Sequence, residues 1–243
     1  MNSFPTIFDW IERLDFLRGM PATYLLLLAG LVVVAVWEWR IALFALTCQY
    51  LLAGLLFIEV LEPRLAIVKL LVGLFVSLML YFTARQAYWP PSPQSPLPPA
   101  PAGASPWERI APMLAPHNLL FRIFLALVLL LLLLTLAQRP GYQLPAVPPP
   151  VNLAIFGLSG LGLLGLALTD NPLRAGMALL LVMLAFELFY NSLEQSVLML
   201  IALAVVNLAI ALAVGYLTQA HTRAQVTGEA DPRVAPTAPP SAE

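Results

Sequence analysis

The chain has 243 residues, of which 60% are hydrophobic and only 10% are charged, and its formal net charge is -1. Ordinary soluble domains carry about 25% charged residues. With a mean hydropathy of +0.87, a water-soluble globular protein is therefore excluded. Nucleic-acid binding is excluded too, because the chain has no excess of basic residues to attract phosphates.

The first twenty residues have an amphipathic pattern. Phe4, Ile7 and Ile11 recur at helical spacing, while Asp9 and Glu12 fall on the opposite side. This pattern predicts a helix lying in the membrane interface, with contact to a partner subunit as the alternative. The acidic residues and the absence of a cleavable apolar core argue against a signal peptide.

About seven apolar stretches of membrane-spanning length follow. Roughly 20 apolar residues in a helix cross ~30 Å of hydrocarbon, and continuous apolar runs favour helices over the alternating strands of a barrel. The predicted spans are residues 21–37, 41–60, 65–84, 119–137, 151–168, 172–190 and 195–218. The predicted fold is thus an all-α, multi-pass transmembrane helical bundle.

Two proline-rich segments divide these spans into a 3+1+3 arrangement, because dense prolines favour extended linkers over helices. The predicted units are an interfacial helix (1–20), a three-helix unit (21–86), a linker (87–117), a single span (118–138), a second linker (139–150), a three-helix unit (151–220) and a disordered tail (221–243).

Two local signals predict helix starts. Asn171 precedes Pro172, which is typical of an N-cap followed by a first-turn proline. Ser192 and Gln195 have the spacing of a capping box at the start of the last span.

Ionisable residues inside hydrocarbon are informative because each costs about 2.5 to 3.5 kcal/mol at mid-membrane. Lys69 lies about one turn into the third span, and Glu59 lies near the end of the second, with Glu62 in the turn between them. The sequence predicts that Lys69 pairs with Glu59 or Glu62. The alternative is that the lysine extends to the interface.

Two further polar residues complete the candidate set of intramembrane polar or proton-relay residues, which is Lys69, Glu59, Glu187 and Asn207. Glu187 is either part of a proton relay or a carboxylate at headgroup level. Asn207 lies in the middle of the last span, where its amide requires a partner across a helix interface and could hold helices together.

Neither a catalytic nor a cofactor site is predicted. Gly160, Gly162 and Gly165 spell the dinucleotide fingerprint, but they lie in an apolar span with no strand before them. We interpret them as a small-residue surface for close helix packing. A metal or haem site needs more ligands than the two histidines, His117 and His221, and the single Cys48. No nucleophile with a nearby base stands out either. We therefore predict no catalytic, metal or cofactor-binding residue.

The basic residues near span ends favour an N-out, C-in orientation in the cytoplasmic (inner) membrane. Seven arginines fall on the predicted cytoplasmic side, against five basic residues outside. The cytoplasmic set is Arg40, Arg85, Arg109, Arg122, Arg174, Arg223 and Arg233.

Residues 162–175, with Gly162, Gly165 and the turn residue Asn171, resemble the first hairpin of the K subunit of bacterial complex I, and the next two spans match it in length and spacing. The same core occurs in the C subunit of multisubunit sodium/proton antiporters and in component E of hydrogenase-4, which also places extra spans before the triplet. Residues 48–85, including the intramembrane Lys69, look like the second and third spans of component E.

This resemblance implies an accessory, non-catalytic membrane subunit of an ion-translocating complex: complex I-like, group 4 hydrogenase-like or antiporter-like. Its partners would be other membrane subunits and the bilayer, and any redox cofactor would belong to those partners. Two carboxylates of the K subunit's proton path correspond by position to Leu180 and Asn207 here, and its basic residues before the turn correspond to Thr169 and Asp170.

A K-like relay would therefore have to be rebuilt around Glu187, Lys69 and Glu59. The alternative function is a structural or assembly scaffold that transports nothing. A free-standing transporter is a third class, for which these spans carry too few polar residues.

Overall fold

The computed structural model describes residues 18–88, 119–145 and 147–229. These residues form seven α-helices and one short 3-10 helix and contain no strand. The helices are α2 (Met20–Ala35), α3 (Trp39–Val60), α4 (Pro63–Tyr88), α6 (Leu119–Ala137), η2 (Pro140–Tyr142), α7 (Pro149–Ala167), α8 (Pro172–Leu193) and α9 (Val197–Glu229). The predicted all-α class is confirmed. The predicted interfacial helix and most of the first linker lie outside the described residues.

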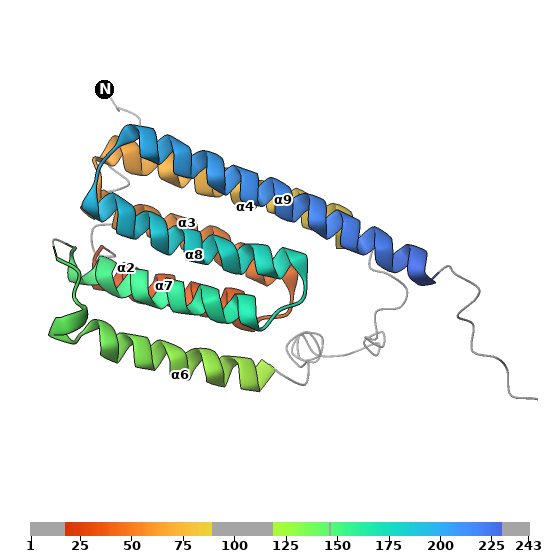
Figure 1. Ribbon diagram of the computed structural model, residues 1–243, viewed down its shortest axis with the longest axis horizontal. Coiled ribbons are helices and arrows are strands. Elements are labelled where there is room, and N and C mark those ends of the chain that lie inside the picture. The colour runs from red at the N-terminus through yellow and green to blue at the C-terminus, as the bar shows by residue number, and fades with distance from the viewer. Residues whose placement is uncertain (1–17, 89–118, 146, 230–243) are drawn as a thin grey trace, which may run out of the picture.

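The helices stack in two layers that run in the same order and direction (Figure 1). One layer contains α2, α3 and α4, and the other contains α7, α8 and α9. Helix α2 packs against α7, α3 against α8 and α4 against α9, while α6 lies at the edge beside α7 and α2. Neighbours within a layer are antiparallel because short turns join them.

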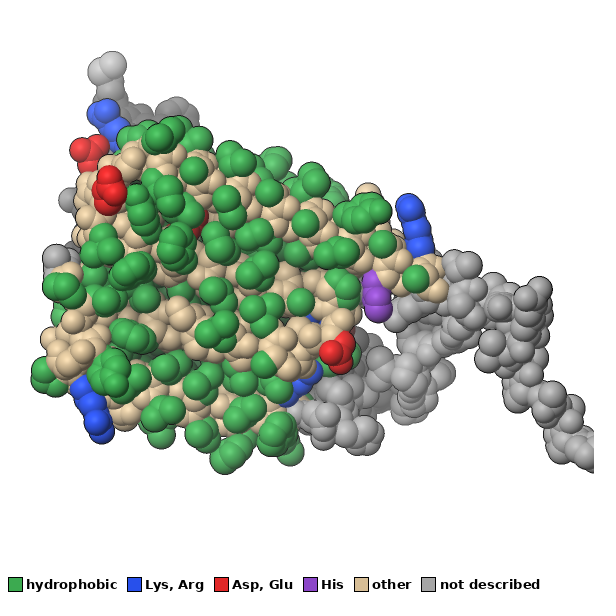
Figure 2. Space-filling view, in the orientation of Figure 1, with side chains coloured by type: hydrophobic (Ala, Val, Ile, Leu, Met, Phe, Trp, Pro, Cys, Tyr) green, Lys and Arg blue, Asp and Glu red, His purple; other side chains and the backbone are tan. Residues whose placement is uncertain are grey.

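The outer surface of this bundle is apolar. Hydrophobic side chains cover the face seen in Figure 2, and α6 has only 6% of its span buried against the rest of the protein. Among the described helices, six are long and apolar enough to cross a membrane. Since such a surface is stable in lipid and not in water, the chain is a multi-pass membrane protein.

Helix α2 is shorter than the sequence predicts. It has 16 residues, which span about 24 Å at 1.5 Å per residue, so it falls below the length of the other six. Six of the seven predicted spans are therefore long enough to cross a membrane, and the seventh, α2, is a shorter apolar helix.

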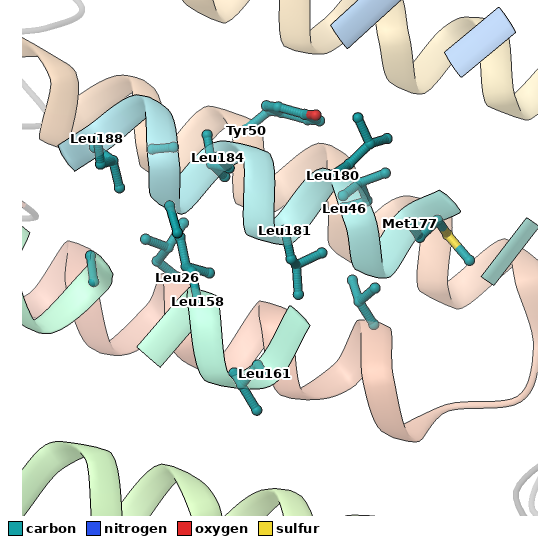
Figure 3. Close-up of a cluster of buried hydrophobic side chains, with 14 of the residues drawn as sticks. Leu26, Leu46, Tyr50, Leu158, Leu161, Met177, Leu180, Leu181, Leu184 and Leu188 are labelled. Carbon is teal, nitrogen blue, oxygen red and sulfur yellow. The ribbon is translucent and has the colours of Figure 1, made fainter. Parts of the chain in front are cut away.

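Leucines from α2, α3, α7 and α8 fill the centre, as Figure 3 shows for Leu26, Leu46, Leu158 and Leu184. Gly162 and Gly165 of α7 let α8 approach closely. A Cβ at Gly162 would lie 2.9 Å from the carbonyl oxygen of Ala178. The interpretation of this glycine series as a packing surface is confirmed.

Several predicted helix ends are corrected. Helix α9 runs to Glu229, so the predicted disordered tail does not begin at residue 221. Helix α4 continues to Tyr88 into the predicted linker, and α7 begins inside the second linker at Pro149. Prolines at a helix start are tolerated because the first backbone N–H groups need no partner within the helix.

One capping prediction holds and the other is wrong. Asn171 caps α8, since its Oδ1 accepts a bond of 3.0 Å from the Leu173 N–H. Ser192 does not start α9. It still belongs to α8 and donates to the Leu188 carbonyl at 2.6 Å, while the Gln195 amide donates to the Val60 carbonyl at 2.5 Å. The Ser192 hydroxyl is thus engaged within the last turn of α8, and Ser196, not Ser192, is the residue immediately before α9.

Candidate functional site

A lysine and a glutamate meet inside the bundle. Lys69 lies nearly two turns into α4, and Glu187 lies nearly two turns before the end of α8. The Lys69 Nζ donates to the Glu187 Oε1 at 2.7 Å, and each side chain is 2% exposed. Both residues lie toward the end of the molecule where α3 joins α4 and α8 joins α9 (Figure 1).

This pairing corrects the predicted partner of Lys69. Glu62 is exposed, and Glu59 is half-buried with its Oε1 3.7 Å from the position of a Cβ at Gly19. Lys69 is buried, so it does not extend to the interface. The lysine turns away from its own hairpin toward α8, because only there is a carboxylate buried to the same degree.

The structure bears on one of the two interpretations of Glu187, that of a carboxylate at headgroup level. A carboxylate at headgroup level would be exposed, yet the Glu187 side chain is enclosed by the bundle. The neighbouring Asn191 does not bind this carboxylate. Its amide donates instead to the backbone carbonyl of Glu187, within the same helix, at 2.7 Å.

Asn207 of α9 is the third member of the cluster. Its Nδ2 donates to the Glu187 Oε1 at 3.0 Å, so one carboxylate oxygen accepts bonds from α4 and from α9. The predicted need of this amide for a partner across a helix interface is confirmed. We call Lys69, Glu187 and Asn207 the buried polar cluster.

The cluster is electrically neutral, which makes its burial tolerable. A single ion moved into a low-dielectric interior costs several kcal/mol, and close pairing with good hydrogen bonds offsets much of that cost. The contact also joins α4 to α8, two helices whose backbones do not otherwise pack extensively.

Further polar side chains near the cluster were not predicted from the sequence. Tyr50 of α3 is buried, lies within electrostatic reach of Glu187, and its hydroxyl has no hydrogen-bond partner among the described residues. Its ring lies against Gly73, where a Cβ would come within 2.4 Å. The sequence contained a signal for Tyr50, because a tyrosine in the middle of an apolar span is unusual.

Gln49 is the second residue that the sequence reasoning missed. It is fully buried, and neither its Oε1 nor its Nε2 has a hydrogen-bond partner in the described part of the chain. Its amide lies beside Gly30 of α2, 3.4 Å from the position of a Cβ there. The Oδ1 of Asn207 likewise has no hydrogen-bond partner among the described residues, so the interior retains unused hydrogen-bonding capacity on α3 and α9.

The Lys69–Glu187 contact permits a simple proton shift. If a proton moves from the ammonium to the carboxylate, an ion pair becomes a neutral amine beside a carboxylic acid, and the net charge of the site is unchanged. Such a shift costs little solvation energy, because no isolated charge is created in the low-dielectric interior. The arrangement can therefore pass one proton between the two side chains without changing the net charge of the site.

The opposite end of the molecule is basic. Two arginines, Arg122 and Arg174, lie against the Trp37 ring, with their guanidinium carbons 5.1 and 4.4 Å from its centre. Arg174 donates to the carbonyl of Val36 and Arg122 to that of Leu168, at the ends of α2 and α7. These arginines satisfy carbonyls that a helix end leaves without partners.

The described residues contain no group of three or more His, Cys, Asp or Glu side chains placed to hold a metal ion. Comparison with protein families, curated proteins and solved structures finds no match to this chain. Fold and site together define an all-α, multi-pass membrane protein with a buried Lys–Glu–Asn cluster.

Proposed function

We propose that the chain is an accessory subunit of an ion-translocating, energy-coupling complex of the inner membrane, with its buried polar cluster taking part in proton transfer. In this proposal α2 is the seventh span of a 3+1+3 bundle, oriented N-out, C-in. The observation that carries the proposal is the 2.7 Å contact between Lys69 and Glu187 within an apolar bundle. The resemblance to complex I K subunits and hydrogenase-4 component E adds the class of host complex.

In the proposed mechanism, Lys69 and Glu187 exchange one proton along their hydrogen bond. Asn207 holds the carboxylate in place from α9 by its bond of 3.0 Å. Tyr50 and Gln49 supply hydroxyl and amide groups that are not engaged with other described residues, and these could extend a path toward α2. Groups with matched proton affinity transfer protons most readily.

Assembly is tested by purification. The tagged chain, extracted from its own membranes in mild detergent, should migrate with antiporter-like or quinone-reactive subunits that mass spectrometry identifies. Migration as a single subunit would refute the proposed host complex.

Proton transfer is tested separately in the assembled complex. Glu187→Gln and Lys69→Gln should lower the number of protons moved per turnover while the complex still assembles. Asn152→Leu is the matched control, because Asn152 is also a buried amide, but it bonds to the α6–α7 connection at Leu144 and Ala137. Normal pumping in both cluster variants would refute the relay.

The second candidate is a scaffold that transports nothing, and it is favoured by the position of the ion pair between α4 and α8. If the pair serves only to join these helices, its loss should reduce the amount of assembled complex. The complex that does assemble would then pump normally, which separates this candidate from the relay.

A further inference from the structure

A groove runs along the outer side of α3 and α4, at the end of the hairpin remote from the buried polar cluster. It encloses about 880 Å³, within the range of about 300 to 1,000 Å³ that is typical of ligand pockets. Four apolar side chains contribute to its walls: Leu43, Phe44, Leu74 and Leu78. Because this surface faces hydrocarbon, an acyl chain is the natural material to fill it.

The outer end of the groove is basic. Arg40 lies in the first turn of α3 and Arg85 in the last turn of α4, so both reach the same membrane surface. The groove lining contains these two arginines and no acidic residue. Glu38, which lies outside the lining, forms an ion pair with Arg40, with its Oε1 4.0 Å from the Arg40 Nε. Two arginines favour an anionic phospholipid over a zwitterionic one such as phosphatidylcholine, because the choline ammonium of the latter cancels the charge of its phosphate.

Aromatic rings flank the arginines. The rings of Trp39 and Tyr81 lie 6.2 Å apart and both line the groove. Tryptophan and tyrosine favour the depth of lipid headgroups. Their position sets the outer end of the groove at the level where a phospholipid carries its phosphate.

A buried hydroxyl lies on the inner wall. Ser77 is 4% exposed and lines the groove, and its Oγ has no hydrogen-bond partner among the described residues. An unpaired hydroxyl in hydrocarbon is costly, so an acceptor from the occupant would stabilise it. Ser77 precedes Arg85 by about 12 Å of helix, so it lies below the phosphate level.

We propose that this groove binds one anionic phospholipid, with the phosphate at Arg40 and Arg85 and an acyl chain along α3 and α4. Basic pockets between membrane helices bind anionic headgroups in this manner. The inference is independent of the proposed function, because no residue of the buried polar cluster lines the groove.

The test compares lipids on the delipidated full-length chain in detergent. Phosphatidylglycerol should raise the melting temperature more than phosphatidylcholine does, and inorganic phosphate alone should not raise it. The Arg40→Gln/Arg85→Gln variant should lose this preference, whereas Arg40→Lys/Arg85→Lys should keep most of it. The matched control, Arg64→Gln/Arg139→Gln, removes two exposed arginines from the opposite end and should behave as the unmodified protein does.

A second measurement does not depend on the folding of the arginine variants. Brominated phosphatidylglycerol should quench tryptophan fluorescence more than brominated phosphatidylcholine, and Trp39→Phe should remove the excess. The proposal is overturned by equal quenching, by a preference that persists without Arg40 and Arg85, by equal stabilisation with phosphate alone, or by a neutral lipid or quinone as the molecule retained at the groove.

Discussion

Lys69 and Glu187 depend on each other because hydrocarbon solvates neither. Each gives up hydration on burial, and the bond of 2.7 Å between them, supported by Asn207, offsets that loss. A buried ion pair therefore contributes little net stability, although either residue alone is strongly unfavourable.

Substitutions at the pair should consequently be non-additive. Lys69→Met alone should destabilise the protein by about 3 to 5 kcal/mol, since it leaves Glu187 without its cation. The double variant Lys69→Met/Glu187→Met should recover most of this loss, because both side chains then suit the apolar interior.

Denaturant unfolding of the purified chain in detergent measures both changes. The exposed Arg64→Met is the control and should stay within about 0.5 kcal/mol of the unmodified protein. A double variant no more stable than the single variant would contradict the argument from pairing.

At the scale of elements, close packing between α7 and α8 depends on the lack of a side chain at Gly162. Membrane helices have no hydrophobic drive to associate, because lipid is equally apolar, so small residues that allow close contact replace it. At Gly162 a Cβ would meet the Val182 Cγ2 at 2.6 Å and also two backbone atoms, the Ala178 carbonyl oxygen and the Val182 nitrogen, both at 2.9 Å. At Gly160 the nearest atom, at 2.2 Å, is the flexible end of Leu133.

Gly162→Ala should therefore destabilise the protein by about 1 to 3 kcal/mol, as overpacking against backbone does. Gly160→Ala, on the same helix, is the matched control and should cost less, since Leu133 can change rotamer. Alanine favours helix over glycine by about 1 kcal/mol at either position. A net loss of stability in the Gly162 variant alone would therefore identify the contact with the α8 backbone as its cause. Thermal unfolding in detergent compares the two, and equal effects would refute the distinction.

At the scale of the whole molecule, charge is distributed unequally between the two ends. Five arginines of the described helices lie toward the end of the molecule where α7 joins α8. These are Arg40, Arg85, Arg122, Arg174 and Arg223. An excess of basic residues marks the cytoplasmic side of a membrane protein.

Cysteine labelling in intact cells tests the orientation. In a Cys48→Ala background, Gln143→Cys in the α6–α7 connection should react with an impermeant maleimide from outside. Ala224→Cys, near the end of α9, should react only after the membrane is permeabilised. The opposite pattern would reverse the proposed N-out, C-in topology.

The sequence by itself determined the solvent, the helical class and most helix positions. Long apolar runs can satisfy their backbone groups in lipid only as helices, and the predicted 119–137 matches α6 at both ends. The cap at Asn171 and the glycine surface of α7 were predictable as well, because both depend on residues close in the sequence.

The tertiary structure alone decided which polar groups meet. Glu187 lies 118 positions from Lys69 in the chain, whereas Glu59 and Glu62 are near neighbours, so proximity in sequence favoured the wrong partner. Stacking α3 and α4 against α8 and α9 brings the buried lysine to Glu187 and Asn207. The physical reason is that burial selects the partner: a charge inside hydrocarbon needs a counter-charge enclosed with it, and only the packing of the two layers determines which residues are enclosed together.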